Sequence, residues 1–366
     1  MNVIQRSVFV ILAVVAVPGI AAAQAPTWVH ELADDIAARV ERQADQLARF
    51  IEERLEAQQA RRQGRGLERG RGPEFTEPFS RTARLGANGT FDLQNVSGDI
   101  VITGRAGSDV RLEATKRVRH PNETEARSIL SEITIQVQER NGSVEVRTEY
   151  PRRRNWSGGV DYSVEVPRDA SVTLRSVSGT VRVTSVNGDL RAESVSGDIV
   201  VTSARRIRLA KTVSGNLEFS GSEADELTAG SVSGDIIVNK LKATGFDAQA
   251  VSGDMRLTDV EIDHASLRSV SGDIEYAGRL LHSGRYALQS HSGDVRVTPT
   301  DARGFAVEAT TFSGDLRSDY PLTLQSSPGN SLASGRRNRA IRGSFGDAGA
   351  TLTLQSFSGD IVIVKR

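Results

Sequence analysis

The tetrapeptide Val232-Ser233-Gly234-Asp235 decides the fold, because the chain repeats it at residues 251–254 and again at 270–273. Each repeat lies 19 residues after the one before it. The same four residues also stand at 96–99 and 195–198, and relaxed copies occupy 177–180, 186–189, 213–216, 291–294, 312–315 and 357–360. Repetition at a nearly fixed period indicates an architecture that stacks one short unit many times.

Apolar and polar residues alternate on both sides of each copy. Ile236 and Val238 follow one copy, and Phe246 and Ala248 precede the next. Alternation with period two predicts strands that bury one face. A unit this short has no room for a crossover helix. We therefore expect a mainly β protein, a parallel β-solenoid (β-helix-like) whose coils of about 18–21 residues stack and bury one continuous core.

The repeated glycine and aspartate are predicted to form a structural corner in every coil. Glycine reaches backbone angles that cost other residues energy, and aspartate and serine side chains can hydrogen-bond the amides of their own turn. The predicted corner residues are Gly98, Asp99, Gly179, Gly188, Asp189, Gly197, Asp198, Gly215, Gly234, Asp235, Gly253, Asp254, Gly272, Asp273, Gly293, Asp294, Gly314, Asp315, Gly359 and Asp360.

A column of stacked aspartates could also bind calcium. Stacked strands lie about 4.8 Å apart, so these carboxylates would be close neighbours. The chain lacks the Gly-Gly-x-Gly-x-Asp pattern of calcium-binding repeats, whose aspartate stands at a different offset. This difference favours the structural interpretation, and we expect no metal, cofactor or catalytic site in the motif.

Residues 1–23 have the pattern of a cleaved secretory signal. Arg6 precedes an apolar run at 8–17, and residues 21–23 are alanines, as a signal peptidase site requires. The run is too short to span a bilayer comfortably. We predict an exported chain that begins near Gln24 and resides in the periplasm or outside the cell.

Composition excludes several classes of function. The chain has no cysteine, which rules out disulfides and thiolate chemistry. Basic and acidic residues number 46 each, so no net charge favours nucleic acid.

Residues 24–60 are predicted to form one long amphipathic helix, because apolar residues recur every three or four positions from Trp28 to Leu55. The apolar stripe is narrow, as in a coiled-coil seam. We favour a homo-oligomer formed through residues 27–60, while packing on the same chain or contact with a membrane or partner stay open.

The rest of the chain divides into three predicted segments. Residues 61–83 form an Arg/Gly-rich linker, which we interpret as a flexible tether. Residues 84–170 form a β module that opens and caps the solenoid, with a helix at 121–130 capped by Asn122 and a hairpin turn at Asn141-Gly142. Residues 171–366 carry the repeats, interrupted by an exposed loop at 317–343.

Two segments and the serial corners carry a family resemblance. Residues 91–104 read Phe-Asp-Leu-Gln-Asn-Val-Ser-Gly-Asp-Ile-Val-Ile-Thr-Gly, and residues 160–170 read Val-Asp-Tyr-Ser-Val-Glu-Val-Pro-Arg-Asp-Ala. Together they resemble the bacterial "putative adhesin" family of β-strand repeats, also called the domain-of-unknown-function 4097 family, over about residues 84–366. The resemblance implies an exported repeat protein and brings no catalytic residues to this sequence.

An enzyme is the alternative function. His291, Ser292 and Asp294 superficially resemble a catalytic triad, but three residues within one turn seldom reach triad geometry. A polysaccharide lyase or hydrolase needs paired acids or a basic cluster on one face, whereas the outward charges are mixed and dispersed. We expect a non-catalytic, adhesin-like or scaffold protein of the cell envelope, which binds an unidentified protein or polymer along its surface. A carbohydrate-active β-solenoid enzyme is the runner-up.

Overall fold

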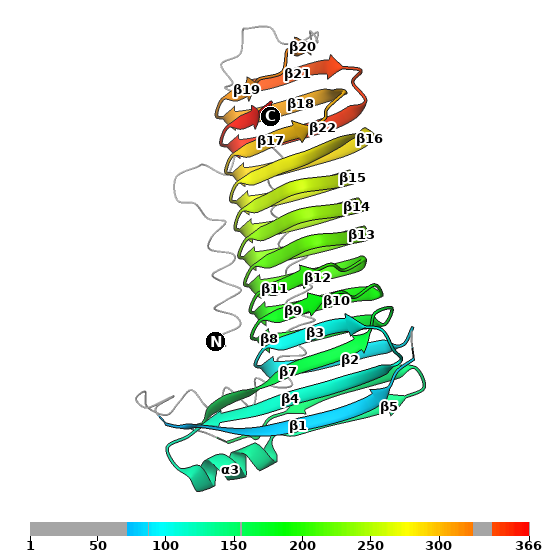
Figure 1. Cartoon of the computed structure of the whole chain (residues 1–366). Coiled ribbons are helices and arrows are strands. Elements are labelled where there is room, and N and C mark those ends of the chain that lie inside the picture. Colours follow the sequence, from blue (N-terminus) through cyan, green and yellow to red (C-terminus); the bar gives the residue numbers. More distant parts are fainter. Residues whose placement is uncertain (1–71, 87, 154–155, 325–338, 366) are drawn as a thin grey trace. The chain divides into compact units, whose positions relative to one another are not determined.

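The computed structural model describes residues 72–86, 88–153, 156–324 and 339–365 (Figure 1). The predicted signal, the helix at 24–60 and most of the linker lie outside these residues. The described part is mainly β, as predicted, with one helix. The elements are β1 (Glu74–Arg84), β2 (Thr90–Ser97), β3 (Ile100–Arg105), β4 (Asp109–Arg119), α3 (Glu123–Glu132), β5 (Thr134–Arg140), β6 (Ser143–Glu149), β7 (Ser157–Pro167), β8 (Ser171–Ser178), β9 (Val181–Thr184), β10 (Asp189–Ser196), β11 (Ile199–Thr202), β12 (Arg206–Ser214), β13 (Leu217–Ser233), β14 (Ile236–Ser252), β15 (Met255–Ser271), β16 (Ile274–Ser292), β17 (Val295–Thr300), β18 (Gly304–Ser313), β19 (Leu316–Ser318), β20 (Thr323–Leu324), β21 (Arg339–Gly346), β22 (Ala350–Ser358) and β23 (Ile361–Ile363).

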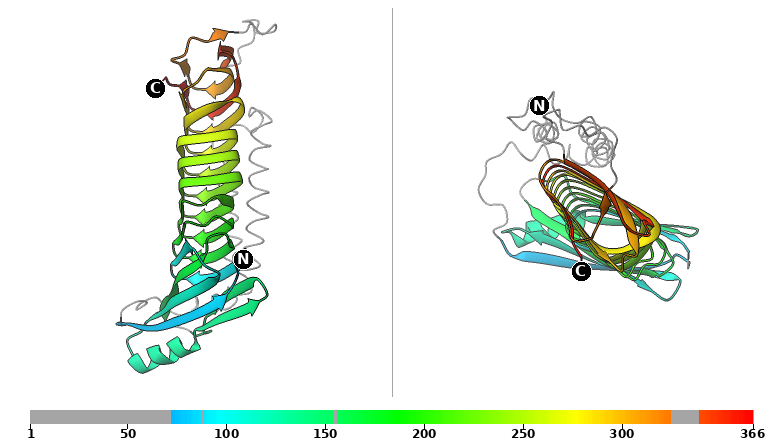
Figure 2. Two further views of the ribbon diagram at one scale, coloured as in Figure 1. Left: turned by 45° about the vertical axis from the view of Figure 1, so that its right-hand side comes forward. Right: turned by 90° about the horizontal axis from the view of Figure 1, so that it is seen from above.

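Successive coils pair in parallel and in register. We call one circuit of the chain around the stack a coil; in β14 to β16 a single strand runs from one Ser-Gly-Asp corner to the next. Ser233 of β13 lies opposite Ser252 of β14, which lies opposite Ser271 of β15. The 19-residue period is therefore the length of one full coil, and equivalent residues of neighbouring coils form columns. Figure 2 shows the coils lying over one another when the stack is seen from its end.

The core lies between the two strand layers. Ile236 and Val238 after a corner, and Leu267 before the next, are fully buried. Larger rings such as Phe219, Phe246 and Tyr276 fill the same space. Burial of apolar area at about 25 cal/mol per Å² is the main favourable contribution to folding, and each coil supplies only a thin slice of it. Stability therefore depends on neighbouring coils.

The order of coils in space differs from their order in the sequence. At the C-terminal end, β22 pairs with β16 on one side and with β18 on the other. Likewise, β23 lies between β17 and β19. The coil at residues 350–363 comes last in the sequence, but in space it is inserted before the coil of β18 and β19.

The N-terminal end has the same kind of insertion. The first coil, β2 and β3, pairs with β8 and β9 on one side and with β6 and β7 on the other. The stack therefore begins inside the segment at 84–170 that we had interpreted as a capping module. Beyond it, β5 pairs antiparallel with β6, and β4 pairs antiparallel with both β1 and β7.

Local signals in this module match the structure. Asn122 caps α3, because its side chain accepts hydrogen bonds from the amides of Thr124 and Glu125. Ala126, Ile129 and Leu130 of the helix are buried. The turn between β5 and β6 places Gly142 at φ 75°, as the Asn-Gly pair predicted.

Two sequence expectations need correction. Part of the predicted loop at 317–343 is strand, because β21 begins at Arg339 and pairs antiparallel with β18. Gly188 directly precedes β10 and Asp189 is its first residue, so both lie at the opposite bend of their coil. Their copy is nine residues from its neighbours, which is half a coil, and it therefore falls on the other side of the stack. No helix within the described ranges is long and apolar enough to cross a membrane.

Candidate functional site

The corner glycines form one tightly packed column. Gly234, Gly253 and Gly272 have φ values of 146°, 144° and 146°, in the region that disfavours side chains. A Cβ added at Gly253 would also collide with the backbone carbonyl of Gly234 in the neighbouring coil. The same close approach runs through the whole stack, from Gly98 to Gly179, Gly197, Gly215, Gly234, Gly253, Gly272, Gly293, Gly359 and Gly314. The corner therefore lets coils approach closely.

The corner aspartates accept hydrogen bonds from backbone amides of the next coil. The sequence had indicated bonds to the amides of their own turn, and this expectation is wrong. The Oδ1 atom of Asp235 accepts a hydrogen bond from the Asp254 amide at 2.8 Å, and Asp254 accepts one from the Asp273 amide at 2.9 Å. The same bond joins Asp161 to Asp99, Asp99 to Thr180, Asp198 to Asn216, Asn216 to Asp235, Asp273 to Asp294, Asp294 to Asp360 and Asp360 to Asp315. The column is a ladder of side-chain caps between coils.

We expect Asp254→Ala to lower the free energy of unfolding by about 1–3 kcal/mol, because it leaves the Asp273 amide without its acceptor. Asp254→Asn should be close to neutral, since Asn216 already fills this role with its amide oxygen. Urea unfolding of the three proteins measures the effect. Equal loss in both variants would show that charge, and not the hydrogen bond, is what the column needs.

A second column comes from the serine or threonine that stands two positions before Ser-Gly. The hydroxyls of Ser290 and Ser356, buried inside the stack, donate to the carbonyls of Gly272 and Gly293 at 3.0 Å. Thr311 bonds the Gly359 carbonyl in the same way at 3.0 Å. The signal was present as a serine or threonine two positions before most copies of Ser-Gly. The sequence of one repeat does not show that this hydroxyl donates to a neighbouring coil, because the bond joins residues of two coils.

The apolar residue of the motif is half-buried in most copies, and Phe357 is buried. Three aromatic members of this column stack although they are distant in the sequence. The His291 and Phe357 ring centroids are 4.9 Å apart, and those of Phe357 and Phe312 are 4.8 Å apart with an angle of 2° between the ring planes. His291 therefore packs against a ring of the inserted coil.

This environment does not assemble a triad. The Nδ1 atom of His291 is buried and has no hydrogen-bond partner among the described residues. Ser292 is exposed, and the Asp294 carboxylate caps the Asp360 amide at 2.8 Å. A serine nucleophile needs a base within hydrogen-bond reach that is itself held in place. His291, Ser292 and Asp294 therefore serve packing and capping in this structure.

His291 should make the protein less stable in mild acid. Burial disfavours the charged imidazolium and lowers the pKa of His291 below its usual value of 6.5. The unfolded chain takes up a proton near pH 6.5, whereas the folded chain resists it, so this residue's contribution is lost as the pH falls below that value. We expect His291→Phe, which continues the aromatic stack, to show a smaller fall in melting temperature between pH 7.5 and 5.5. A fall equal to that of the unaltered protein would contradict this.

The described part of the chain contains no group of three or more His, Cys, Asp or Glu side chains arranged to hold a metal ion. Each carboxylate of the ladder that bonds the next coil uses one oxygen on a backbone amide.

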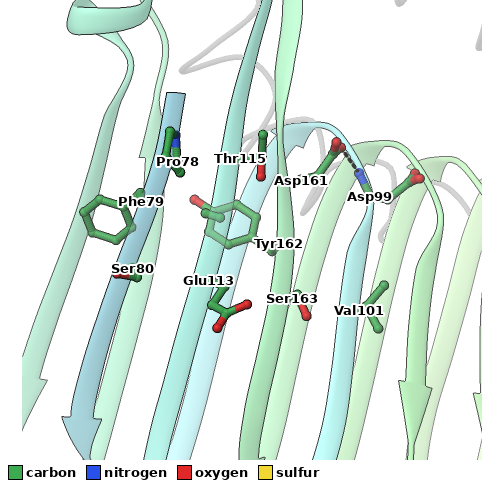
Figure 3. A pocket seen from close by; sticks show the side chains of 11 residues that line it. Pro78, Phe79, Ser80, Asp99, Val101, Glu113, Thr115, Asp161, Tyr162 and Ser163 are labelled. Atoms are coloured by element: carbon green, nitrogen blue, oxygen red, sulfur yellow. Dashed lines mark hydrogen bonds between the residues drawn. The ribbon is translucent and has the colours of Figure 1, made fainter. Parts of the chain in front are cut away.

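A groove of about 550 Å³ lies on the outer face of the sheet at the N-terminal end (Figure 3). We call it the capping groove, and its outward-facing residues come from β1, β4, β7, β3 and the corner that precedes β3. They are Pro78, Ser80, Asp99, Val101, Glu113, Thr115, Asp161 and Ser163. Tyr162 also borders it, but its hydroxyl bonds Thr148 at 2.6 Å inside the core. Burial raises the pKa of Tyr162 to about 12, so this hydroxyl stays neutral.

The stacked parallel coils, the glycine corners and the aspartate ladder define a β-strand repeat protein. The family comparison is more specific. The Toastrack DUF4097 family matches residues 92–364, and the chain belongs to it.

Solved structures of similar proteins are distant in sequence. A protein from Bacteroides fragilis named a "putative adhesin" is 12% identical, with 79% of this chain and 97% of that chain covered and a TM-score of 0.40. A Parabacteroides distasonis protein of the same name is 13% identical, with 81% and 99% covered and a TM-score of 0.41. Another protein from Parabacteroides distasonis, named a "putative lipid binding protein", is 13% identical, with 78% and 96% covered and a TM-score of 0.43. The search of curated proteins found no match.

Proposed function

We propose that this protein is an exported, non-catalytic component of the bacterial cell envelope that binds a partner or polymer along the outer surface of its stacked coils. The observation that carries the proposal is the coil-to-coil ladder. Asp235, Asp254 and Asp273 each tie one coil to the next through a backbone amide. Such bonds hold the outer faces of successive coils in fixed register, which presents an extended, preorganised surface.

Export rests on the sequence of residues 1–23, and the absence of catalysis rests on the site geometry. Two of the three acids in the capping groove, Asp161 and Asp99, are already engaged. Asp161 is ion-paired to Arg117 with Nε and Oδ2 2.6 Å apart, and its Oδ1 accepts the Asp99 amide. Asp99 in turn caps the Thr180 amide at 2.9 Å. A glycoside hydrolase needs two carboxyl groups free to exchange protons and attack the sugar, and this arrangement does not supply them.

Co-sedimentation tests the proposal. Purified full-length protein would be mixed with envelope fractions from a bacterium that encodes it, and the pellet measured against protein concentration. Saturable sedimentation that soluble fragments of the same polymer compete away is the expected result. Protein that stays in the supernatant with every fraction would refute an envelope-binding role. Release of sugar products from those fractions over time would instead favour the carbohydrate-active enzyme.

Residues 27–60 remain the predicted self-association segment within this function. Light scattering on the full-length protein and on a variant lacking residues 24–72 should show a larger assembly only when the segment is present. Equal masses per chain for both proteins would remove self-association from the proposal and leave its binding surface intact.

A further inference from the structure

We propose that the capping groove binds a neutral saccharide, an inference that rests on the proposed envelope function and names its ligand class. The hollow has a clear origin in side-chain size. Across the sheet, Ser80 lies opposite Glu113, Glu113 opposite Ser163, and Ser163 opposite Val101. The next coils continue the same row with Arg182, Val200, Glu218, Ile237 and Arg256. Serine occupies two of the four groove positions, Ser80 and Ser163, on either side of Glu113. None of the five following positions of the row is a serine, and two of them are arginines.

The groove offers both kinds of hydrogen-bonding group. Ser80, Thr115 and Ser163 present hydroxyls that make no side-chain hydrogen bond within the described ranges. Glu113 is exposed and, among the same residues, its carboxylate has no hydrogen bond or ion pair. Hydroxyls donate and accept, and a carboxylate accepts two hydrogen bonds at once. A ligand that carries many hydroxyls can use every one of these groups.

The charges of the lining argue against both a cationic and an anionic ligand. Arg117 offsets the charge of Asp161, and the Asp99 carboxylate already accepts a backbone amide. Glu113 is therefore the one carboxylate of the lining left without a partner in the part of the chain that the structure describes. A single exposed carboxylate attracts an amine only weakly in water. The three acids together also disfavour an anionic ligand, which leaves an uncharged one.

The remaining lining suits a sugar ring. Pro78 on β1 and Val101 on β3 add apolar side chains to the lining. Figure 3 shows both side chains together with the hydroxyl-bearing residues. A binding site of this size range generally combines apolar walls with a few placed polar groups. The groove opens on the sheet surface, so a polymer can pass across it without ending there.

Binding of three trisaccharides to the full-length protein tests the inference. Cellotriose, maltotriose and chitotriose would be titrated by calorimetry and by saturation-transfer NMR, with spermidine as the cationic comparison. We expect at least one trisaccharide to bind with a Kd below about 10 mM. Failure of all three at that concentration, or binding of spermidine in preference to all of them, would overturn the inference.

Two matched variants locate the binding. Ser163→Arg fills the groove at a row position where Arg182 and Arg256 already stand, so the fold should accept it. It should weaken trisaccharide binding at least about tenfold. Val200→Arg changes the same row away from the groove and should leave binding within about twofold. Equal affinity in the two variants would place the saccharide elsewhere.

The outcome for the proposed function is separate. If Ser163→Arg sediments with envelope fractions as well as the unaltered protein does, the groove inference is wrong while the envelope function stands. If no form of the protein sediments although the trisaccharides bind in the groove, the envelope function is wrong while the saccharide site stands.

Discussion

Gly253→Ala is expected to lower the free energy of unfolding by about 2–6 kcal/mol, one of the largest effects of a single methyl group in this chain. Two causes add. Gly253 has a φ of 144°, and forcing a side chain into that conformation costs about 1–3 kcal/mol. The new Cβ would also collide with the Gly234 carbonyl, and relieving such overpacking costs roughly another 1–3 kcal/mol.

Two other glycines separate these causes. Gly107 has a φ of 138°, but a Cβ there would meet nothing within 4 Å, so Gly107→Ala should show the strain alone. Gly230, on the outer face of β13, has room for a Cβ, whose nearest neighbour would be 3.6 Å away. Gly230→Ala should be neutral or stabilise by up to about 1 kcal/mol, because alanine in a strand loses less entropy on folding.

Urea unfolding of the three variants, followed by circular dichroism, gives the comparison. For each variant, the urea midpoint is read together with the slope of the unfolding free energy against urea concentration, because repeat proteins can depart from two-state unfolding. The order expected is Gly253→Ala least stable, then Gly107→Ala, then Gly230→Ala. A Gly253→Ala midpoint equal to that of Gly230→Ala would mean that the corner tolerates a side chain and that the coils are not held this closely.

The sequence predicted the unit of this fold well, because the unit is local. Alternation around Ile236 and Val238 marks buried strand faces, and a 19-residue step between Gly234 and Gly253 marks one coil. Which amide the aspartate caps was not predictable in the same way. A carboxylate beside a turn can reach its own turn or the next coil, and the choice depends on a spacing between coils that no single unit contains.

The order of the coils was beyond the reach of repeat reasoning for a related reason. Corners with nearly the same sequence fit against one another in any order, so the motif at 357–360 matches the corner of β16 as well as that of β18. The sequence contains no local pattern that predicts the capping groove. Its hollow depends on Ser80, Glu113 and Ser163, which are far apart in the chain and become neighbours only through antiparallel pairing of β1, β4 and β7.

Removing residues 348–366 is expected to disorder more of the protein than the coil that is deleted. β22 and β23 are the partners that join β18 and β19 to the stack. Without them, Phe305 and Val307 of β18, which are buried in the full-length protein, lose the layer beneath them. Hydrogen exchange should therefore become fast throughout β18, whereas β14 and β15 should stay protected, because coils in a stack depend mainly on their immediate neighbours.

The inserted order itself can be tested with cysteines, since the chain has none. Arg296 lies opposite Val362, and Val362 lies opposite Arg317. Neighbouring strands are about 4.8 Å apart, within the Cα separation of about 4.4–6.8 Å that a disulfide spans. Arg296→Cys with Val362→Cys should form a disulfide on mild oxidation. Arg296→Cys with Arg317→Cys, two coils apart, should not. If the second pair closes and the first does not, the coils follow the order of the sequence, and protection of β18 should then survive the deletion.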